Sequence, residues 1–243
     1  MPSMLPRPTA PYRRGGGIRG VASWHHLMMQ PSRSRLEFEI VETLPAGMTL
    51  PDPLALLFEW IEANGFFVDA RGQRFGCLCA PADRRSVVPG TDITFQAEGN
   101  TYLGAWFGRE STAIMTRVCV FAKTGGDGST AAFWIDDDGR QRIVHMGSGS
   151  GSTLTCVLAD DAVDFLRLLA IGYDEICWGG FSSAPHHDDH SSPKHNDLYR
   201  DWVRTTFAVD IPVSGESIVR HEDYMQDAEP ADPFCRWVSQ VGG

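Results

Sequence analysis

The sequence has no long hydrophobic run and few basic residues. Its most apolar stretch, residues 165–171, already contains Arg167, whereas a membrane-spanning helix needs about 18 or more apolar residues. The 21 Lys and Arg face 31 Asp and Glu, which gives the 243-residue chain a formal net charge of −10. Because nucleic-acid binding relies on clustered Lys and Arg, we expect no nucleic-acid partner and no membrane insertion. An acidic protein instead favours a basic partner through electrostatic steering.

Two signatures of catalytic or nucleotide-binding loops are also missing. Gly-rich stretches occupy residues 125–129 and 147–152, but neither contains the Gly-Lys-Ser/Thr ending of a P-loop. No Ser has Gly at both the −2 and +2 positions, as a nucleophile elbow requires. Both stretches therefore predict turns in which glycine adopts positive φ, and a ligand-binding role is the alternative. We expect no cofactor.

The chain has no hydrophobic segment of signal-peptide type, and most of its six cysteines lie in apolar stretches. This pattern predicts reduced, buried thiols in a cytoplasmic protein rather than disulfides. Cys77 and Cys79 lack the spacing of a zinc knuckle and, in a strand, would both point into the core. The other cysteines are Cys119, Cys156, Cys177 and Cys235.

The predicted domain scheme has four parts. Residues 1–30 carry four Arg, four Pro and no acidic residue, so they are interpreted as a disordered tail or as a start assigned too far upstream, with Met28 or Met29 as the true start. Residues 31–178 form an α+β domain, 179–195 a polar loop, and 196–243 a C-terminal helical extension packed on the same domain.

Local patterns predict the elements of this domain. Alternation of Leu36, Phe38 and Ile40 with polar neighbours predicts a half-buried strand. Asp52 and Pro53 predict the start of a helix, with Asp52 as the capping carboxylate, and Asn64-Gly65 predicts its end. Short strands follow, one pair joined by an Asp138-Gly139 hairpin. The predicted strands are 74–79, 92–97, 101–107, 114–121, 130–135, 141–146 and 154–158.

Three more helices complete the prediction. Asp160 and Asp161 cap one that ends at Gly172, a second carries Tyr199 and Trp202, and a short third begins at Asp232-Pro233. Because the strands do not alternate with helices, we expect an α+β fold with a largely antiparallel sheet and extra C-terminal helices, not a Rossmann fold. The tryptophans expected in the core are Trp134, Trp178, Trp202 and Trp237.

Two clusters of titratable residues are candidate sites. His186 and His190 have the i, i+4 spacing of two metal ligands on one helix face, and with His187 and His195 they define an alternative reading as a metal-dependent hydrolase. Pro185 and Pro193 favour a loop with no metal. His145 lies in a predicted strand, where a core histidine is expected and a catalytic base is the alternative.

Residues 118–178 resemble the SUKH superfamily, which contains yeast cell-wall regulators and bacterial toxin-immunity proteins. The residues that carry the resemblance are, in order, Phe121-Ala122, Gly125 to Ser129, Phe133-Trp134, Asp138-Gly139, Ile143-Val144, Leu158-Ala159-Asp160 and Phe165-Leu166.

The resemblance implies a curved sheet flanked by helices and a non-enzymatic binding function. We therefore expect an immunity protein that neutralises a cognate toxin, with a regulatory scaffold as the alternative. Together with the acidic charge, it indicates a basic toxin domain as partner. The candidate contact residues are Asp136, Asp137, Asp138, Asp160, Asp161 and Asp164.

Overall fold

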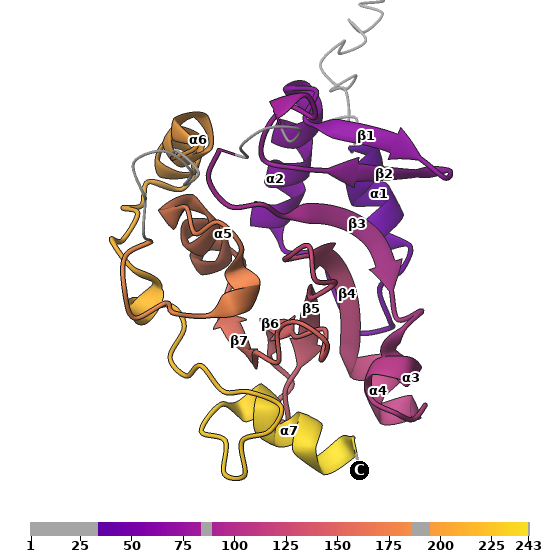
Figure 1. Ribbon diagram of the computed structural model, residues 1–243. Helices are drawn as coiled ribbons and strands as arrows, with labels where there is room; N and C mark the ends of the chain where they lie inside the picture. Colours follow the sequence, from indigo (N-terminus) through magenta and orange to yellow (C-terminus); the bar gives the residue numbers. More distant parts are fainter. Residues whose placement is uncertain (1–33, 84–88, 186–194, 243) are drawn as a thin grey trace, which may run out of the picture. The chain divides into compact units, whose positions relative to one another are not determined.

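An open antiparallel sheet organises residues 34–83, 89–185 and 195–242, which are the residues described by the computed structural model (Figure 1). They belong to one unit, Arg33–Gly243. Its strands are hydrogen-bonded in chain order from β1 to β7, so the sheet contains no crossover connection. The strands are β1 (Phe67–Ala70), β2 (Gln73–Gly76), β3 (Thr94–Gly99), β4 (Val118–Lys123), β5 (Thr130–Ile135), β6 (Gln141–Met146) and β7 (Thr155–Ala159).

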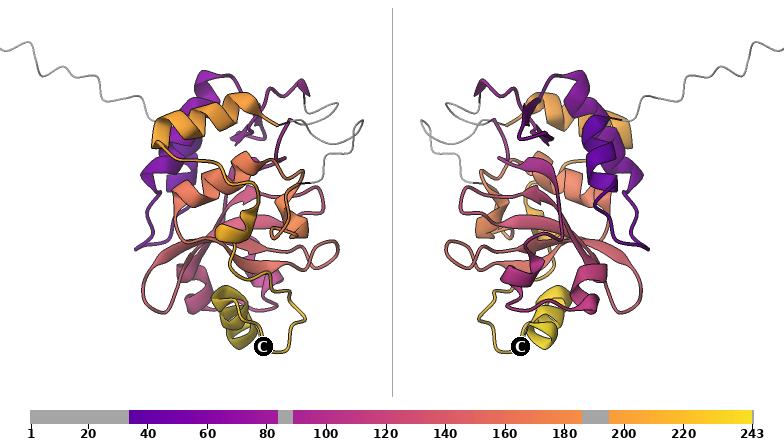
Figure 2. Two further views of the ribbon diagram at one scale, coloured as in Figure 1. Left: turned by 90° about the vertical axis from the view of Figure 1, so that its left-hand side faces the viewer. Right: turned by 90° about the vertical axis from the view of Figure 1, so that its right-hand side faces the viewer.

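Helices cover both faces of this sheet, as the two views of Figure 2 show. The group formed by α1, α2, α5 and α6 contributes to a core on one face, and α3, α4 and α7 contribute to a core on the other. The helices in the described part are α1 (Arg35–Val41), α2 (Asp52–Ala63), α3 (Leu103–Trp106), α4 (Thr112–Arg117), α5 (Ala162–Ile171), α6 (Asp197–Phe207) and α7 (Pro233–Val241), with 3-10 turns η3 (Ile176–Trp178) and η4 (Gly215–Ser217).

The larger core is built around aromatic rings from three neighbouring strands. The rings of Phe95 and Phe133 flank that of Phe121, with centroid distances of 6.5 and 4.3 Å, and Phe165 of α5 meets Phe121 edge-on. All four side chains are fully buried. Truncating one of them to Ala would cost about 3–5 kcal/mol of folding free energy.

The smaller core lies under α7. Trp134 of β5 contacts Phe234 and Trp237 at centroid distances of 5.3 and 5.7 Å. The Arg117 guanidinium lies 4.9 Å from the centre of the Trp237 ring, a cation–π contact. Asp232 begins α7 by accepting hydrogen bonds from the backbone N–H groups of Phe234 and Cys235, so the predicted final helix is confirmed.

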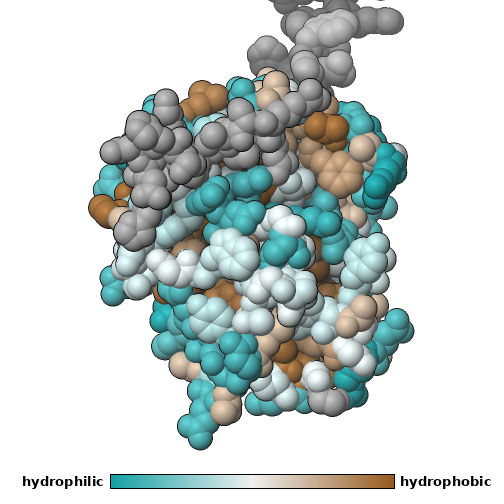
Figure 3. Space-filling view, viewed as in Figure 1, coloured by the Kyte–Doolittle hydropathy of each residue, from teal (hydrophilic) through white to brown (hydrophobic). Residues whose placement is uncertain are grey.

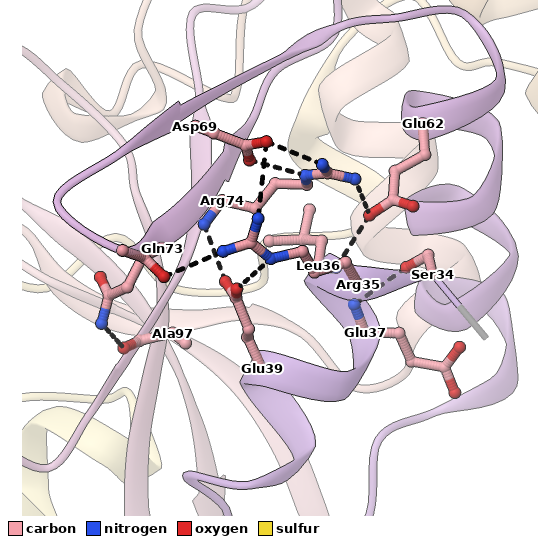
Figure 4. Close-up of polar contacts among 11 residues, drawn as sticks. Ser34, Arg35, Leu36, Glu37, Glu39, Glu62, Asp69, Gln73, Arg74 and Ala97 are labelled. Atoms are coloured by element: carbon pink, nitrogen blue, oxygen red, sulfur yellow. Dashed lines mark hydrogen bonds and ion pairs between the residues drawn. The ribbon is translucent and has the colours of Figure 1, made fainter.

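A polar network ties the β1–β2 hairpin to the first two helices (Figure 4). The guanidinium of Arg74 pairs with Asp69 at 2.9 Å and with Glu62 at 3.0 Å, while its backbone N–H donates to Glu39. Arg35 pairs with Glu39 on its own helix and donates to the carbonyl oxygen of Gly72. This edge of the sheet is therefore fixed by side chains as well as by its strand pairing.

Several predicted elements are confirmed. The α+β fold, the antiparallel sheet and the C-terminal helices are present, and the strands at 130–135 and 141–146 coincide with β5 and β6. Asp161 caps α5, and Gly172 ends it with φ of 95°. The helix predicted to begin at Asp52 and to end at Asn64-Gly65 is α2, but Pro51 is its N-cap and Asp52 makes no capping hydrogen bond.

The predicted strand at residues 36–40 is wrong, because these residues form α1. Ser34 caps that helix by accepting a hydrogen bond from the N–H of Glu37. Leu36 and Ile40, four residues apart, share its buried face, and Phe38 is 57% exposed. An i, i+4 pair fits the helical period equally well, so alternation over five residues did not distinguish the two structures.

Two other strand predictions are wrong in the same way. Residues 101–107 contain α3, and the first part of 114–121 belongs to α4, which Ser111 caps through the N–H of Ile114. Strand β1 was not predicted. The other predicted strands shift by a few residues, and Cys77 and Cys79 follow β2 rather than lying in it.

The described residues contain no helix that is both long and apolar enough to cross a membrane. All six cysteines are buried and none forms a disulfide, which confirms the prediction of buried thiols without disulfides. Burial raises the pKa of the Cys119 thiol to about 11, so this thiol stays protonated at neutral pH.

Candidate partner-binding surfaces

Figure 3 shows a face of the molecule on which hydrophobic residues form small, separate patches among hydrophilic ones. A binding surface on this face must therefore rest on particular charged and aromatic side chains rather than on a broad apolar area. The predicted contact carboxylates lie at the β5–β6 hairpin and at the start of α5.

Asp136 is a structural residue of the hairpin. Its side chain is almost fully buried, and Oδ1 accepts hydrogen bonds from the backbone N–H groups of Asp138 and Arg140 at 3.0 and 2.8 Å. Its other oxygen lies 3.0 Å from Nε of Arg142. With its lone pairs engaged in this way, the Asp136 carboxylate stabilises the turn and presents little charge to a partner.

Arginines accompany the other two hairpin carboxylates. Asp137 lies 2.8 Å from Arg117, and Asp138 lies 2.6 Å from Arg140. Both carboxylates are more than 70% exposed, so the tip of the hairpin offers a surface of mixed charge.

The carboxylates near α5 are arranged similarly. Asp160 lies between Arg142 at 3.0 Å and Arg220 at 2.6 Å, and Asp164 pairs with Arg167 of the same helix. Asp161 accepts the capping hydrogen bond from the N–H of Asp164. Five of the six predicted contact residues thus have an arginine partner, which weakens the negative field there. Their role in binding stays a prediction.

The two Gly-rich loops are joined by one carboxylate. Asp127 accepts hydrogen bonds from the N–H and the hydroxyl of Ser129 in its own loop, and from the Ser148 hydroxyl and the Ser152 N–H in the other. Burial alone would raise the pKa of Asp127, but these four hydrogen bonds hold it well below its usual range. The predicted turns are confirmed, with positive φ at Gly128 and Gly149. These four donors already have an acceptor, so they do not form a phosphate site.

A second acidic surface, which the sequence did not reveal, lies beside these loops. We call it the acidic rim and define it as Asp92, Asp174 and Glu175. The backbone N–H of Asp92 donates to the carbonyl oxygen of Asp174 at 2.7 Å. Partial burial, together with the charges of Glu175 and Asp92, raises the pKa of Asp174. Among the described residues, no Lys, Arg or His lies within ion-pair distance of Asp174 or Glu175, unlike the hairpin carboxylates.

Trp178 stands next to this rim. Its side chain is 57% exposed, and its indole N–H donates to Glu175 Oε2 at 2.9 Å. The other oxygen of Glu175 accepts from the N–H of Gly126 at 2.7 Å. The expectation that Trp178 is a core residue is therefore wrong: the η3 turn places Ile176 and Cys177 in the interior and the indole at the surface. Trp202 is half-buried, whereas Trp134 and Trp237 are buried as predicted.

A groove crosses the sheet from this rim to α3. Thr94, Lys123, Thr130 and Met146 are directly paired across β3 to β6, so their side chains share a face. Two adjoining hollows meet at Lys123 and Gly128. The one at the loops has a volume of about 250 Å³ and is lined by Asp92, Thr94, Lys123, Gly125, Gly126 and Gly128. The one at α3 has about 210 Å³ and is lined by Glu98, Tyr102, Leu103, Trp106, Val120, Lys123, Gly128, Thr130 and Met146.

His145 is a core residue, as expected. Its Nδ1 lies 2.8 Å from the carbonyl oxygen of Leu154 and its Nε2 lies 2.9 Å from the Thr124 hydroxyl. A carbonyl only accepts, so Nδ1 carries the proton and Nε2 accepts from the hydroxyl. Complete burial lowers the pKa of His145 to about 4. The imidazole is therefore neutral and enclosed at neutral pH.

The alternative metal site falls largely outside the described residues. His186, His187 and His190 belong to residues 186–194, which the structure does not describe, and His195 lies at the surface with Nδ1 3.2 Å from Arg200. In the described part of the chain, no group of three or more His, Cys, Asp or Glu side chains is placed to hold a metal ion.

The chain matches no protein-family model, no curated protein and no solved structure.

Proposed function

We propose that the chain is a non-enzymatic binding protein that captures a basic protein, with a fold of the SUKH type and a role as the immunity protein of a cognate toxin. One observation carries the proposal. An exposed tryptophan, Trp178, is held in place by Glu175, and in the part of the chain that the structure describes neither Glu175 nor Asp174 has an arginine within ion-pair distance. The net charge of −10 supports the same polarity of partner.

Trp178 and the carboxylates beside it affect both the rate and the strength of binding. Tryptophan is enriched among the residues that dominate binding energy at protein interfaces. The hydrogen bond to Glu175 fixes the indole before a partner arrives, which lowers the entropy lost on association. The carboxylates of Asp174 and Glu175 attract a cationic surface and accelerate encounter.

The hairpin surface supports the proposal less strongly. A basic partner that approached Asp137 or Asp138 would compete with Arg117 and Arg140 for the same oxygens. We therefore place the main contact at the acidic rim and Trp178, and assign the hairpin carboxylates a secondary part.

The test compares Trp178→Ala and Asp174→Asn with Asp138→Asn, a matched loss of one carboxylate on the hairpin. Binding to the basic protein that copurifies with the tagged chain is measured by isothermal titration calorimetry at low and at physiological salt. Trp178→Ala should weaken binding at least about tenfold, and Asp174→Asn should weaken it mainly at low salt. Asp138→Asn should change it little. The proposal is refuted if the wild-type chain and the three variants bind the basic protein with equal affinity, or if that affinity does not change with salt.

A further inference from the structure

Trp178 is held by the edge of its ring and presents ring surface to solvent. The indole N–H lies in the plane of the ring, so its hydrogen bond to Glu175 Oε2 at 2.9 Å fixes the edge and leaves the faces free of that carboxylate. The residue is 57% exposed. In the part of the chain that the structure describes, the cation–π contacts are those of Arg74 and Arg117, and neither involves Trp178.

The charge beside this ring is negative and is not neutralised by the described residues. Glu175 accepts hydrogen bonds from neutral donors, which are the indole N–H, the N–H of Gly126 at 2.7 Å and the Cys177 thiol at 3.7 Å. Partial burial and then the charge of Glu175 raise the pKa of Asp174, so the two carboxylates act on each other. An anion bound to the indole N–H also polarises the ring toward its faces, and a cation is attracted both by the ring and by the carboxylates.

Two arginines of the same chain show which cation suits a ring with a carboxylate beside it. The guanidinium of Arg117 lies 4.9 Å from the centre of the Trp237 ring and pairs with Asp137 at 2.8 Å. The guanidinium of Arg74 lies 3.7 Å from the centre of the Phe67 ring and also binds two carboxylates. A planar guanidinium stacks on a ring with its face while its edge donates to carboxylate oxygens, whereas an ammonium group is a compact, strongly hydrated point charge. Arginine therefore fits such a site better than lysine.

We propose that Trp178 receives an arginine of the basic partner, whose guanidinium stacks on the indole and binds the carboxylates of Asp174 and Glu175. The inference rests on the proposed function and names the residue that the partner inserts at this surface. A lysine at the same place would keep the charge but lose the stacking and the paired hydrogen bonds. The site therefore prefers arginine to lysine, which charge attraction alone does not.

The probe is a set of three blocked, rhodamine-labelled peptides with the same Gly-Ser background. The first carries a pair of Arg, the second a pair of Lys, and the third a pair of citrulline, which keeps the shape of arginine without its charge. Binding of each peptide to the full chain is measured by fluorescence anisotropy at low salt. The Arg peptide should bind at least about threefold more tightly than the Lys peptide and at least about tenfold more tightly than the citrulline peptide.

Three variants separate the ring from the charge. Trp178→Leu keeps an apolar side chain but removes the aromatic face, so the preference for Arg over Lys should disappear. Asp174→Asn removes charge and leaves the ring, so it should weaken the Arg and Lys peptides alike. The matched control is Tyr102→Leu, which replaces an aromatic residue that is 67% exposed at the start of α3, and it should change neither affinity.

The outcomes separate this inference from the proposed function. If the wild-type chain shows no measurable binding of the Arg peptide or binds the Arg and Lys peptides equally, or if Trp178→Leu keeps the preference, the arginine site is wrong. The proposed function then stands as long as Trp178→Ala still weakens capture of the basic protein. If Trp178→Ala has no effect on that capture, the proposed function itself fails. Loss of the preference in Tyr102→Leu would place the arginine at α3 and contradict the inference.

Discussion

Replacing Asp127 by Ala should destabilise the chain more than any other loss of a partly exposed carboxylate. The substitution removes four hydrogen bonds that join residues 125–129 to residues 147–152 and leaves the buried Ser129 without its acceptor. Because Asp127 is only partly buried, each bond is discounted to about 0.5–1 kcal/mol, so the free energy of unfolding should fall by about 3 kcal/mol. The melting temperature should fall by about 6–12 °C.

Thermal and urea unfolding followed by circular dichroism measure this effect, with Asp138→Ala as the control. The direction in which the stabilisation by Asp127 changes with pH follows from the shift of its pKa. Since the folded pKa of Asp127 is lowered, the stabilisation is fully present above the ordinary Asp pKa of about 3.9 and is lost as the pH falls below it. A loss below about 1 kcal/mol at neutral pH, or a loss equal to that of Asp138→Ala, would refute the assignment of Asp127 as the link between the loops.

Other predictions test the core and the helix ends. The folded His145 binds a proton only near pH 4, whereas the unfolded residue binds it near pH 6.5, so wild-type stability should fall by about 3 kcal/mol as the pH drops across this range. His145→Gln should remove that part of the pH dependence. If the free energy of unfolding from urea titrations falls with pH in the variant as it does in the wild type, the prediction is wrong. Asp161→Ala should cost about 1 kcal/mol through loss of the α5 cap, measured as a lower urea midpoint. Gly172→Ala places a Cβ at a φ of 95° and should cost about 1 kcal/mol or more; an unchanged midpoint would count against the left-handed cap.

Much of the fold was predictable where local chemistry and tertiary structure agree. The ends of α5 and α7 follow from Asp161, Gly172 and Asp232, whose capping contacts involve residues close in sequence. The β5–β6 hairpin was placed to the residue because Asp138-Gly139 specifies a turn between two strands.

The errors come from short apolar runs. Over five to seven residues, helical and strand periods can bury the same side chains, as at Leu36 and Ile40. The side-chain oxygens of Ser34 and Ser111 cap α1 and α4 and so distinguish these helices from strands. A single serine, however, is also common in loops and gives only a weak signal in the sequence.

The candidate surfaces were predictable only in part. Asp137 and Asp160 stand out in the sequence as acidic, but their partners Arg117 and Arg220 lie 20 and 60 residues away along the chain. Nothing in the sequence around the aspartates indicates that these arginines neutralise them. Trp178 follows the apolar Ile176 and Cys177 and shares their pattern, so its exposure depends on the η3 turn.

The most direct test of the central claim is a parallel capture experiment in native cell lysate. Three tagged baits are used: the wild-type chain, Asp138→Asn, and a double variant that combines Trp178→Ala with Asp174→Asn. The bound proteins are identified and quantified by mass spectrometry, and the net charge of each is taken from its sequence. A basic protein should be recovered in stoichiometric amount with the first two baits and strongly depleted with the double variant. Equal recovery with all three, or a stoichiometric partner that is acidic, would contradict the account.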